Sequence, residues 1–238
     1  MTGRALPPSS PFGGDDGSAP AALAAALTQA DPAARLAAVV EALRSERVLI
    51  PVVARLDEMD EPGAHGVAGE KSAHTAMVTV AAPDGRAVIP VFSGVVAMHA
   101  WRADARPVPV EGRRAALAAG TEAAGLLVLD PGTASVLVPR PAVRAIALGE
   151  PWLPALRNPV VHEALRVALT PVPGVQAVAL EPGRDTEVTV VVHLEPRPQP
   201  WDERAVTATL QACQQQLAAA EEVVDLVDSV AVRAVLGR

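Results

Sequence analysis

Apolar residues recur along this chain at two spacings, one typical of helices and one typical of strands. Between Leu36 and Leu43 they follow the i, i+3, i+4, i+7 pattern of an amphipathic helix, and Asp31–Pro32 offers it a cap and a first-turn proline. A shorter alanine-rich helix is predicted from about Ser18. Further helices are predicted over 93–102, with Ser93 as the cap, 113–119 and 141–149.

Runs of valine, leucine and isoleucine between these helices predict strands. The Pro-Asp-Gly turn at 83–85 predicts a hairpin, and Pro90 indicates a strand end or a sheet edge because proline cannot donate a ladder hydrogen bond. The run 126–129 is apolar on both faces, as a central strand requires. Residues 57–72 have no period and are predicted to form a mobile loop. The predicted strands cover 48–56, 75–82, 86–91, 108–111, 126–129 and 135–138.

The last third of the chain repeats this alternation on a smaller scale. Asn158–Pro159 again places a cap before a proline, and the apolar stripe that ends at Leu169 predicts a helix. Strands are predicted over 175–180 and 187–194, the second with its valines on one face. A helix over 202–218 and a strand over 223–227 complete the order α-β-β-α-β.

These patterns predict an α/β to α+β protein with two folded parts. Residues 1–17 are rich in proline, glycine, serine and aspartate and are predicted to be a disordered leader. Residues 18–149 form a mixed-sheet domain with its preceding helices, and 159–238 form the smaller α+β domain. The segment 150–158, which contains two prolines and Trp152, is the predicted linker.

Composition narrows the choice of partners. A net charge of −7 repels polyanions, and an aromatic content of 2% leaves few rings on which bases could stack, so we exclude nucleic acid. The single cysteine excludes an internal disulfide and fits a reducing compartment. We see no signal-peptide pattern and no apolar run of about 18 residues. The sequence therefore predicts a cytoplasmic protein that does not bind a membrane.

Two side chains are candidates for a nucleophile. Cys213 lies in the apolar row of a predicted helix, away from the electropositive settings that stabilise thiolates, so a buried structural cysteine is the favoured interpretation. Ser93 follows a strand and precedes a helix, but a nucleophile elbow needs glycine two residues before the serine, where Val91 stands. We therefore assign no catalytic residue.

The histidines do not form a ligand motif. His65, His74 and His99 with Glu70 are the nearest approach to a metal cluster, but their spacing matches no known pattern. His193 lies on the polar face of its predicted strand with nothing catalytic beside it. Phosphate-binding glycine loops are absent from the sequence, so we predict no metal and no cofactor.

Two tryptophans are candidates for contacts. Trp152 and Trp201 each stand beside prolines near the start of the second domain. Tryptophan is enriched at binding hot spots and also packs domains together. We favour interdomain packing over an external partner.

Three motifs resemble the N-terminal domain of the SseB family, named for enhanced serine sensitivity. They are VIPVFS at 88–93 followed by Trp101, PVPVEG at 107–112, and GLLVLDPGT at 125–133, closed by the helix over 141–149. Asp130 stands where that family usually has asparagine, and Thr133 where it has serine; both fit a turn. The resemblance covers about 75–149, leaves the helices before Leu43 outside, and extends less distinctly over 160–227 to the family's C-terminal domain.

The resemblance implies no reaction and no catalytic residues. Our leading hypothesis is a non-catalytic protein that binds another protein or a second copy of itself. The alternatives are a sensor of a small molecule such as an amino acid, suggested by the family's name, and a hydrolase or sulfurtransferase.

Overall fold

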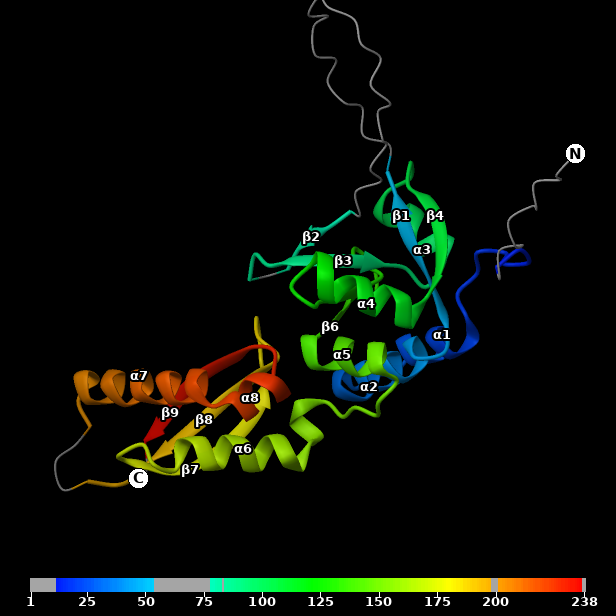
Figure 1. Ribbon diagram of the computed structural model, residues 1–238. Coiled ribbons are helices and arrows are strands. Elements are labelled where there is room, and N and C mark those ends of the chain that lie inside the picture. The colour runs from blue at the N-terminus through cyan, green and yellow to red at the C-terminus, as the bar shows by residue number, and fades with distance from the viewer. Residues whose placement is uncertain (1–11, 54–77, 83, 198–200, 237–238) are drawn as a thin grey trace, which may run out of the picture.

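The computed structural model describes residues 12–53, 78–82, 84–197 and 201–236. Helices and strands form two halves, each with its own sheet, as Figure 1 shows. The predicted mixture of α and β structure is confirmed. The predicted loop over 57–72, with His65, Glu70 and His74, lies outside the described residues. Within the described part of the chain, no helix is long and apolar enough to cross a bilayer.

The N-terminal half contains a mixed sheet in the order β2-β3-β5-β6. Strands β3 and β5 are parallel, and the outer pairs are antiparallel. A separate antiparallel pair, β1 and β4, is joined to the end of β3 through a bridge between Leu49 and Phe92. The elements of this half are α1 (Ala21–Leu27), α2 (Pro32–Leu43), β1 (Arg47–Val52), β2 (Val80–Ala81), β3 (Ala87–Val91), α3 (Val95–Trp101), β4 (Arg106–Glu111), α4 (Gly112–Glu122), β5 (Leu127–Leu129), β6 (Val136–Val138) and α5 (Arg140–Leu148).

The hairpin and the central strand agree with the sequence patterns. β2 pairs with β3, with Asp84 and Gly85 in the turn between them, and β5 lies between β3 and β6 with all three of its residues buried. Pro90 is not on an edge strand, because β3 has neighbours on both sides. Its register partner is Val128, while the pairing of β2 with β3 ends at Val80 and Val88. Pro90 thus lies beyond the described end of β2, so its lack of an N–H group leaves no hydrogen bond of this ladder unmade.

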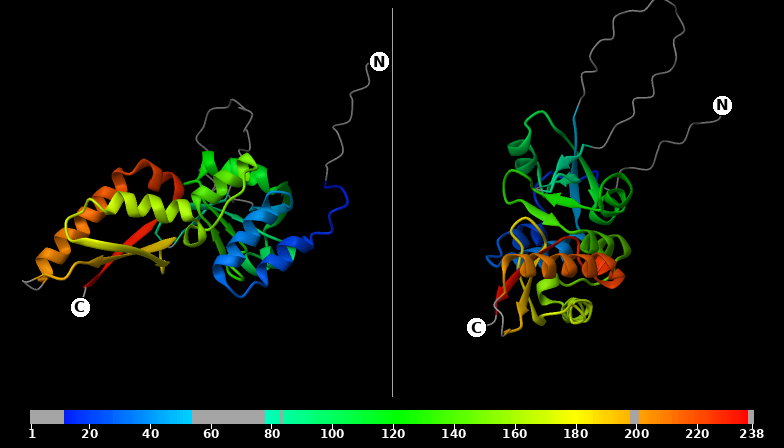
Figure 2. Two further views of the ribbon diagram at one scale, coloured as in Figure 1. Left: turned by 90° about the horizontal axis from the view of Figure 1, so that it is seen from below. Right: turned by 90° about the vertical axis from the view of Figure 1, so that its left-hand side faces the viewer.

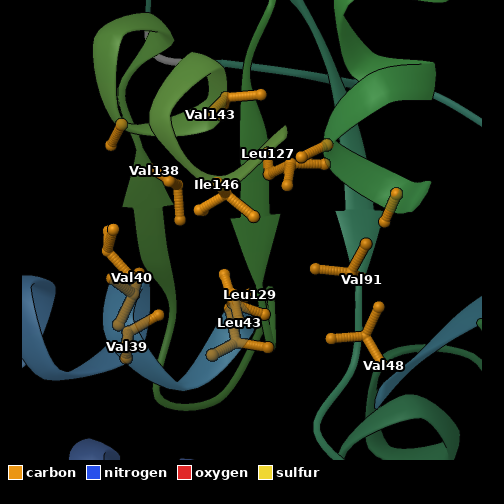
Figure 3. Close-up of a cluster of buried hydrophobic side chains, with 14 of the residues drawn as sticks. Val39, Val40, Leu43, Val48, Val91, Leu127, Leu129, Val138, Val143 and Ile146 are labelled. Atoms are coloured by element: carbon orange, nitrogen blue, oxygen red, sulfur yellow. The ribbon is translucent and has the colours of Figure 1, made fainter. Parts of the chain in front are cut away.

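One aliphatic core holds this half together. Helices α2 and α5 cover one face of the sheet with Val39, Leu43, Val143 and Ile146, each 2% exposed or less (Figure 3). Leu23 of α1 belongs to the same cluster. Each such side chain contributes about 1.5–3 kcal/mol on burial. The two N-terminal helices are therefore part of this domain.

Residues 12–17, before α1, are held against the domain, which contradicts the predicted leader over this stretch. Asp15 forms an ion pair with Arg47, whose Nη2 lies 2.8 Å from Asp15 Oδ1. The Val95 amide donates to the Gly17 carbonyl at 2.8 Å. Polar, glycine-rich composition suggested disorder, but it does not show a partner that is distant in sequence.

The C-terminal half is a three-stranded sheet with helices on one face, as the left view of Figure 2 shows. β7 and β8 are antiparallel, and β9 runs parallel to β8 at the edge. Asn158 and Asp202 cap α6 and α7 through their side chains. The elements are η1 (Ala155–Arg157), α6 (Pro159–Leu169), β7 (Val175–Pro182), β8 (Val188–Leu194), α7 (Glu203–Ala219), α8 (Glu221–Leu226) and β9 (Val230–Leu236).

The strand predicted over 223–227 is wrong. Residues 223–226 belong to α8, Val227 is its C-cap, and the last strand is β9. Val223 and Val227 are four residues apart and both 3% exposed, whereas Val224 is 39% exposed. A spacing of four residues puts two side chains on one face of a helix, which in a short apolar run is easily mistaken for a strand.

Candidate functional site

The ends of the parallel strands β3 and β5 are joined by a buried polar pair. Ser93 follows β3 and Asp130 follows β5. The Ser93 amide donates to Asp130 Oδ1 at 2.8 Å, and its hydroxyl donates to Oδ2 at 2.6 Å. The predicted cap role of Ser93 is wrong, because Gly94 is the N-cap residue of α3 and the Ser93 hydroxyl is committed to Asp130. The two family-like motifs therefore meet in space.

This pair has a structural role, because it ties the end of β3 to the end of β5. The side chains of Ser93 and Asp130 belong to residues 4% and 2% exposed, so a substrate has no access to them. Burial raises the pKa of Asp130, and the two donors from Ser93 oppose that rise. Asp130 adopts a φ of +50°, a conformation that aspartate and asparagine tolerate better than most residues. The turn that follows β5 thus depends on both the backbone and the side chain of Asp130.

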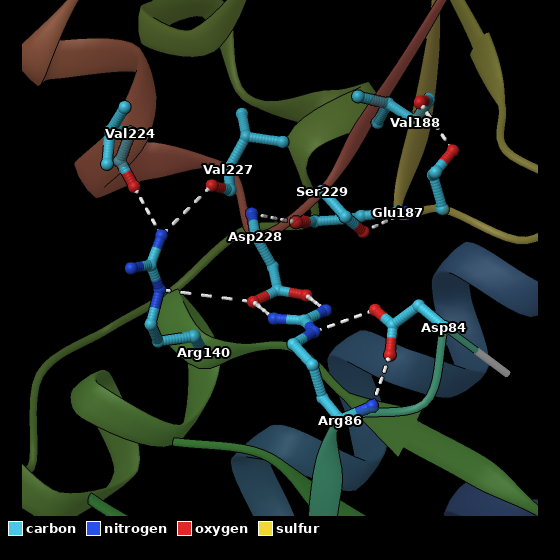
Figure 4. A network of polar contacts seen from close by, with 10 residues as sticks. Asp84, Arg86, Arg140, Glu187, Val188, Val224, Val227, Asp228 and Ser229 are labelled. Atoms are coloured by element: carbon cyan, nitrogen blue, oxygen red, sulfur yellow. Dashed lines mark hydrogen bonds and ion pairs between the residues drawn. The ribbon is translucent and has the colours of Figure 1, made fainter. Parts of the chain in front are cut away.

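A second buried carboxylate joins the two halves. Asp228, between α8 and β9, has a side chain that is 2% exposed. Both of its oxygens accept from Arg86, at 2.9 Å from Nη1 and 2.6 Å from Nη2 (Figure 4). Arg86 also donates from Nε to Asp84 at 2.7 Å. Such a bidentate pair is strong and directional, and here it connects the start of β3 to the start of β9.

Glu187 lies next to this pair. Its Oε2 accepts from the Asp228 amide at 2.7 Å, and its own amide donates to Ser229 Oγ at 2.9 Å. Its Oε1 is buried without a described hydrogen-bond partner. Burial raises the pKa of Glu187 to about 7; the Asp228 amide and Arg140 oppose the rise, and the Asp228 charge adds to it.

Arg140 brings the N-terminal half onto α8. Its Nη2 donates to the carbonyls of Val224 and Val227 at 2.6 and 3.5 Å, and its Nε lies 3.9 Å from Asp228 Oδ1. Those carbonyls belong to the last turn of α8 and to the residue that follows it, where a helix leaves carbonyl groups without internal partners. Arg140 supplies donors for them, and its charge suits the negative end of the helix.

A pocket of about 250 Å³, which we name the β9 pocket, opens beside this cluster. Arg140, Asp228 and Ser229 lie at its polar side. The remaining wall is mostly aliphatic and comes from three elements of the C-terminal half. Its principal apolar residues are Leu217 and Ala218 of α7, Val223 of α8, Val227 just after α8, and Val230 and Val232 of β9.

The outer edge of β9 borders the same pocket. Among the described residues, no strand pairs with β9 on the side away from β8. The Val188 amide donates to the Ser229 carbonyl, and Val188 is in register with Val230. In a parallel ladder this places the main-chain groups of odd-numbered residues toward β8. The N–H and C=O groups of Val230, Val232, Ala234 and Leu236 therefore point outward.

The candidate nucleophiles and ligands are dispersed. Cys213 is fully buried within α7, and burial raises the pKa of its thiol. His99 lies in the last turn of α3, and His193 is half-buried on β8, opposite the core-facing valines. The described part of the chain contains no group of three or more histidine, cysteine or acidic side chains that could hold a metal.

The two candidate tryptophans pack against different cores. Trp152 contacts the core of the N-terminal half, and Trp201 contacts that of the C-terminal half. The Trp201 indole donates to the Glu195 carbonyl at 2.9 Å, and the Arg197 guanidinium lies 3.6 Å above its ring. The structure does not bring the two indoles together, and a role for either in binding a partner stays a prediction.

Sequence reasoning missed the residues that join the halves. Arg86, Arg140, Glu187 and Asp228 lie in four separate segments, and Arg86 and Asp228 are 142 positions apart. Each looked like an ordinary charged residue in a turn or at the end of an element. The weak signal was that Asp228-Ser229 interrupts the apolar residues 226–232.

A family model described as the SseB protein N-terminal domain matches residues 20–145. No curated protein and no solved structure shows significant similarity to the chain. The match includes α1 and α2, which corrects the view that the helices before Leu43 lie outside the resemblance. It ends before the C-terminal half, whose resemblance to the family's C-terminal domain stays a prediction. Because the model covers more than half of the 238 residues, this protein belongs to the SseB family.

Proposed function

We propose that this chain is a non-catalytic protein that binds an extended segment of another protein along the outer edge of β9. The observation that carries the proposal is a seven-residue edge strand, apolar except for Arg233, whose outward main-chain groups have no described strand partner. Such an edge is a template for strand addition, in which main-chain hydrogen bonds supply much of the affinity.

A second copy of the chain fits this edge less well than a different protein. Arg233 is the middle residue of β9, so a two-fold pairing in full register would place Arg233 opposite its own copy. Like charges directly opposite each other destabilise a strand pair. Arg233 is also held by Glu181 at 2.6 Å on the open face of the sheet. These features support a partner that is a different protein.

Proline at Ala234 tests the proposal. Ala234→Pro removes one outward N–H and places a ring in the path of an added strand, while the ladder to β8 keeps its bonds. Ala234→Ser keeps the amide and is the matched control. Tagged wild-type and variant chains are compared by quantitative capture from lysate, with native mass spectrometry for self-association and urea unfolding to check the fold.

The expected result is a set of proteins retained by the wild type and by Ala234→Ser, and retained at least about tenfold less by Ala234→Pro. Retention of the same proteins by all three chains contradicts strand addition at β9. A wild-type chain that is strictly monomeric and retains no partner contradicts the protein-binding role itself.

Sensing of a small molecule such as an amino acid is a second candidate. The β9 pocket favours it, because its size suits a small ligand and the Arg140 guanidinium lies at its polar side. Thermal shift against a panel of amino acids is the test, since a ligand at 100 times its Kd stabilises the fold by about 2.7 kcal/mol. A flat response across the panel removes this candidate. A hydrolase or sulfurtransferase based on Cys213 or Ser93 has no support, because both residues are buried.

A further inference from the structure

We infer that the β9 pocket receives an aliphatic side chain of the strand that pairs with β9, and so selects which segment binds. This inference rests on the proposed function and adds the chemistry of the ligand. Two residues carry it, because Val230 and Val232 both line the pocket and present their main-chain groups outward.

The geometry of a ladder brings a partner's side chain to the pocket. Opposite residues in paired strands point to the same face, with Cβ atoms about 4.5–5.5 Å apart. The side chains of Val230, Val232 and Ala234 lie on the face that packs against the core of the C-terminal half. Every second side chain of an added strand therefore lies on that face, and the one opposite Val230 or Val232 lies at the pocket.

The size and the lining of the pocket specify an apolar side chain. Its volume of about 250 Å³ is below the roughly 300–1,000 Å³ of sites for drug-sized ligands, so the suitable occupant is a group no larger than one side chain or one amino acid. Gln214 of α7, an exposed residue, also lines the pocket, and the other polar groups at its border already have partners. Asp228 accepts from Arg86, Ser229 Oγ accepts from the Glu187 amide, and Arg140 donates to two carbonyls near the end of α8. An aliphatic group leaves all of these bonds intact.

The pocket is complete only when the two halves are docked. Arg140 forms part of its wall and belongs to α5, whereas the other lining residues belong to α7, α8, β9 and the segment between α8 and β9. Arg140 also holds the carbonyls of Val224 and Val227. The Arg86–Asp228 pair fixes the start of β9 against the N-terminal half. The N-terminal domain thereby helps to shape a site on the C-terminal half.

A display library of random peptides long enough to span β9 tests the inference on the full-length chain. The wild type is compared with Ala218→Phe, which fills the pocket, and with Ala219→Phe, a neighbouring exposed position outside the lining. Ala234→Pro, which blocks the edge, is selected in parallel. Enriched peptides are then synthesised with leucine, alanine or aspartate at the shared position, and their Kd values are measured by fluorescence anisotropy.

We expect the wild type and Ala219→Phe to enrich peptides that share one branched aliphatic position. For the synthetic peptides, replacing that leucine with aspartate should weaken binding by about tenfold to a hundredfold in the wild type and by less than threefold in Ala218→Phe. No shared aliphatic position in the wild-type selection overturns the inference. If Ala218→Phe prefers leucine over aspartate as strongly as the wild type does, the pocket is not the site of the side chain and the inference is overturned. In that case a loss of binding in Ala234→Pro would still support strand addition at β9. Equal enrichment by Ala234→Pro overturns both proposals.

Discussion

Removing either member of the Arg86–Asp228 pair should destabilise the protein, and by unequal amounts. The Asp228 side chain is 2% exposed, and Arg86→Met removes its bidentate partner, so that Arg140 Nε at 3.9 Å is its nearest remaining cation. Asp228→Asn leaves Arg86 with Asp84 at 2.7 Å and a side chain that is 32% exposed to water. The stranded carboxylate therefore lacks the solvation that the stranded guanidinium keeps.

The magnitudes follow from these surroundings. Breaking a buried pair by removing one partner costs about 3–5 kcal/mol, which is the range expected for Arg86→Met. Asp228→Asn keeps one acceptor for Arg86, and water screens the unpaired cation, so its cost is about 1–2 kcal/mol. The double variant has no stranded carboxylate and should be more stable than Arg86→Met by at least about 1 kcal/mol.

Urea unfolding at a fixed pH of about 8, above the pKa of Glu187, measures these differences. Circular dichroism and tryptophan fluorescence are recorded together, because coincident transitions justify a single free energy of unfolding. The reasoning is refuted if Asp228→Asn costs as much as Arg86→Met, or if the double variant is less stable than both single variants.

Three further predictions concern single sites. The pKa of Glu187 is raised from 4.5 to about 7 in the folded state, so the free energy of unfolding should fall as pH rises through this interval. The free energy of unfolding of Glu187→Gln should therefore be about 1–3 kcal/mol higher than that of the wild type above pH 7. A gain that persists below pH 4.5 contradicts this. Because asparagine tolerates the φ of +50° found at Asp130, Asp130→Asn should change the free energy of unfolding by less than about 1 kcal/mol. Asp130→Ala should lower it by about 2–4 kcal/mol, because alanine loses both hydrogen bonds to Ser93. Equal losses in the two variants would be inconsistent with this. A Cβ at Gly112 would lie 2.2 Å from the Leu43 carbonyl, so Gly112→Ala should cost about 3 kcal/mol or more in thermal or urea unfolding, and a stable variant refutes the close packing of α2 and α4.

Local chemistry accounts for the elements that sequence reasoning predicted well. The Asp31 carboxylate accepts from the amides of Ala33 and Ala34, as its position before the proline of α2 indicated. The turn that contains Asp84 and Gly85 joins two paired strands. A cap or a turn involves residues within a few positions of each other, so its partners can be found by reading along the chain.

The errors arose where the partner is distant in sequence. Ser93 has the composition of a helix cap, yet its hydroxyl binds Asp130, 37 positions away. Asp15 belongs to a stretch typical of disorder, yet Arg47 orders it. In both cases a bond across the fold prevailed over the local preference of the residue.

The sequence by itself determined the helical and strand periods, most of the turns and caps, and the resemblance to the SseB family. Only the tertiary structure decided that Arg86 and Arg140 converge on Asp228, that β9 is an edge strand, and that a pocket opens beside it. The physical reason is the separation of the interacting residues along the sequence. Periodicity records which face of one element is apolar, whereas a buried charge finds its partner, and a strand keeps or loses a neighbour, only when separate elements pack.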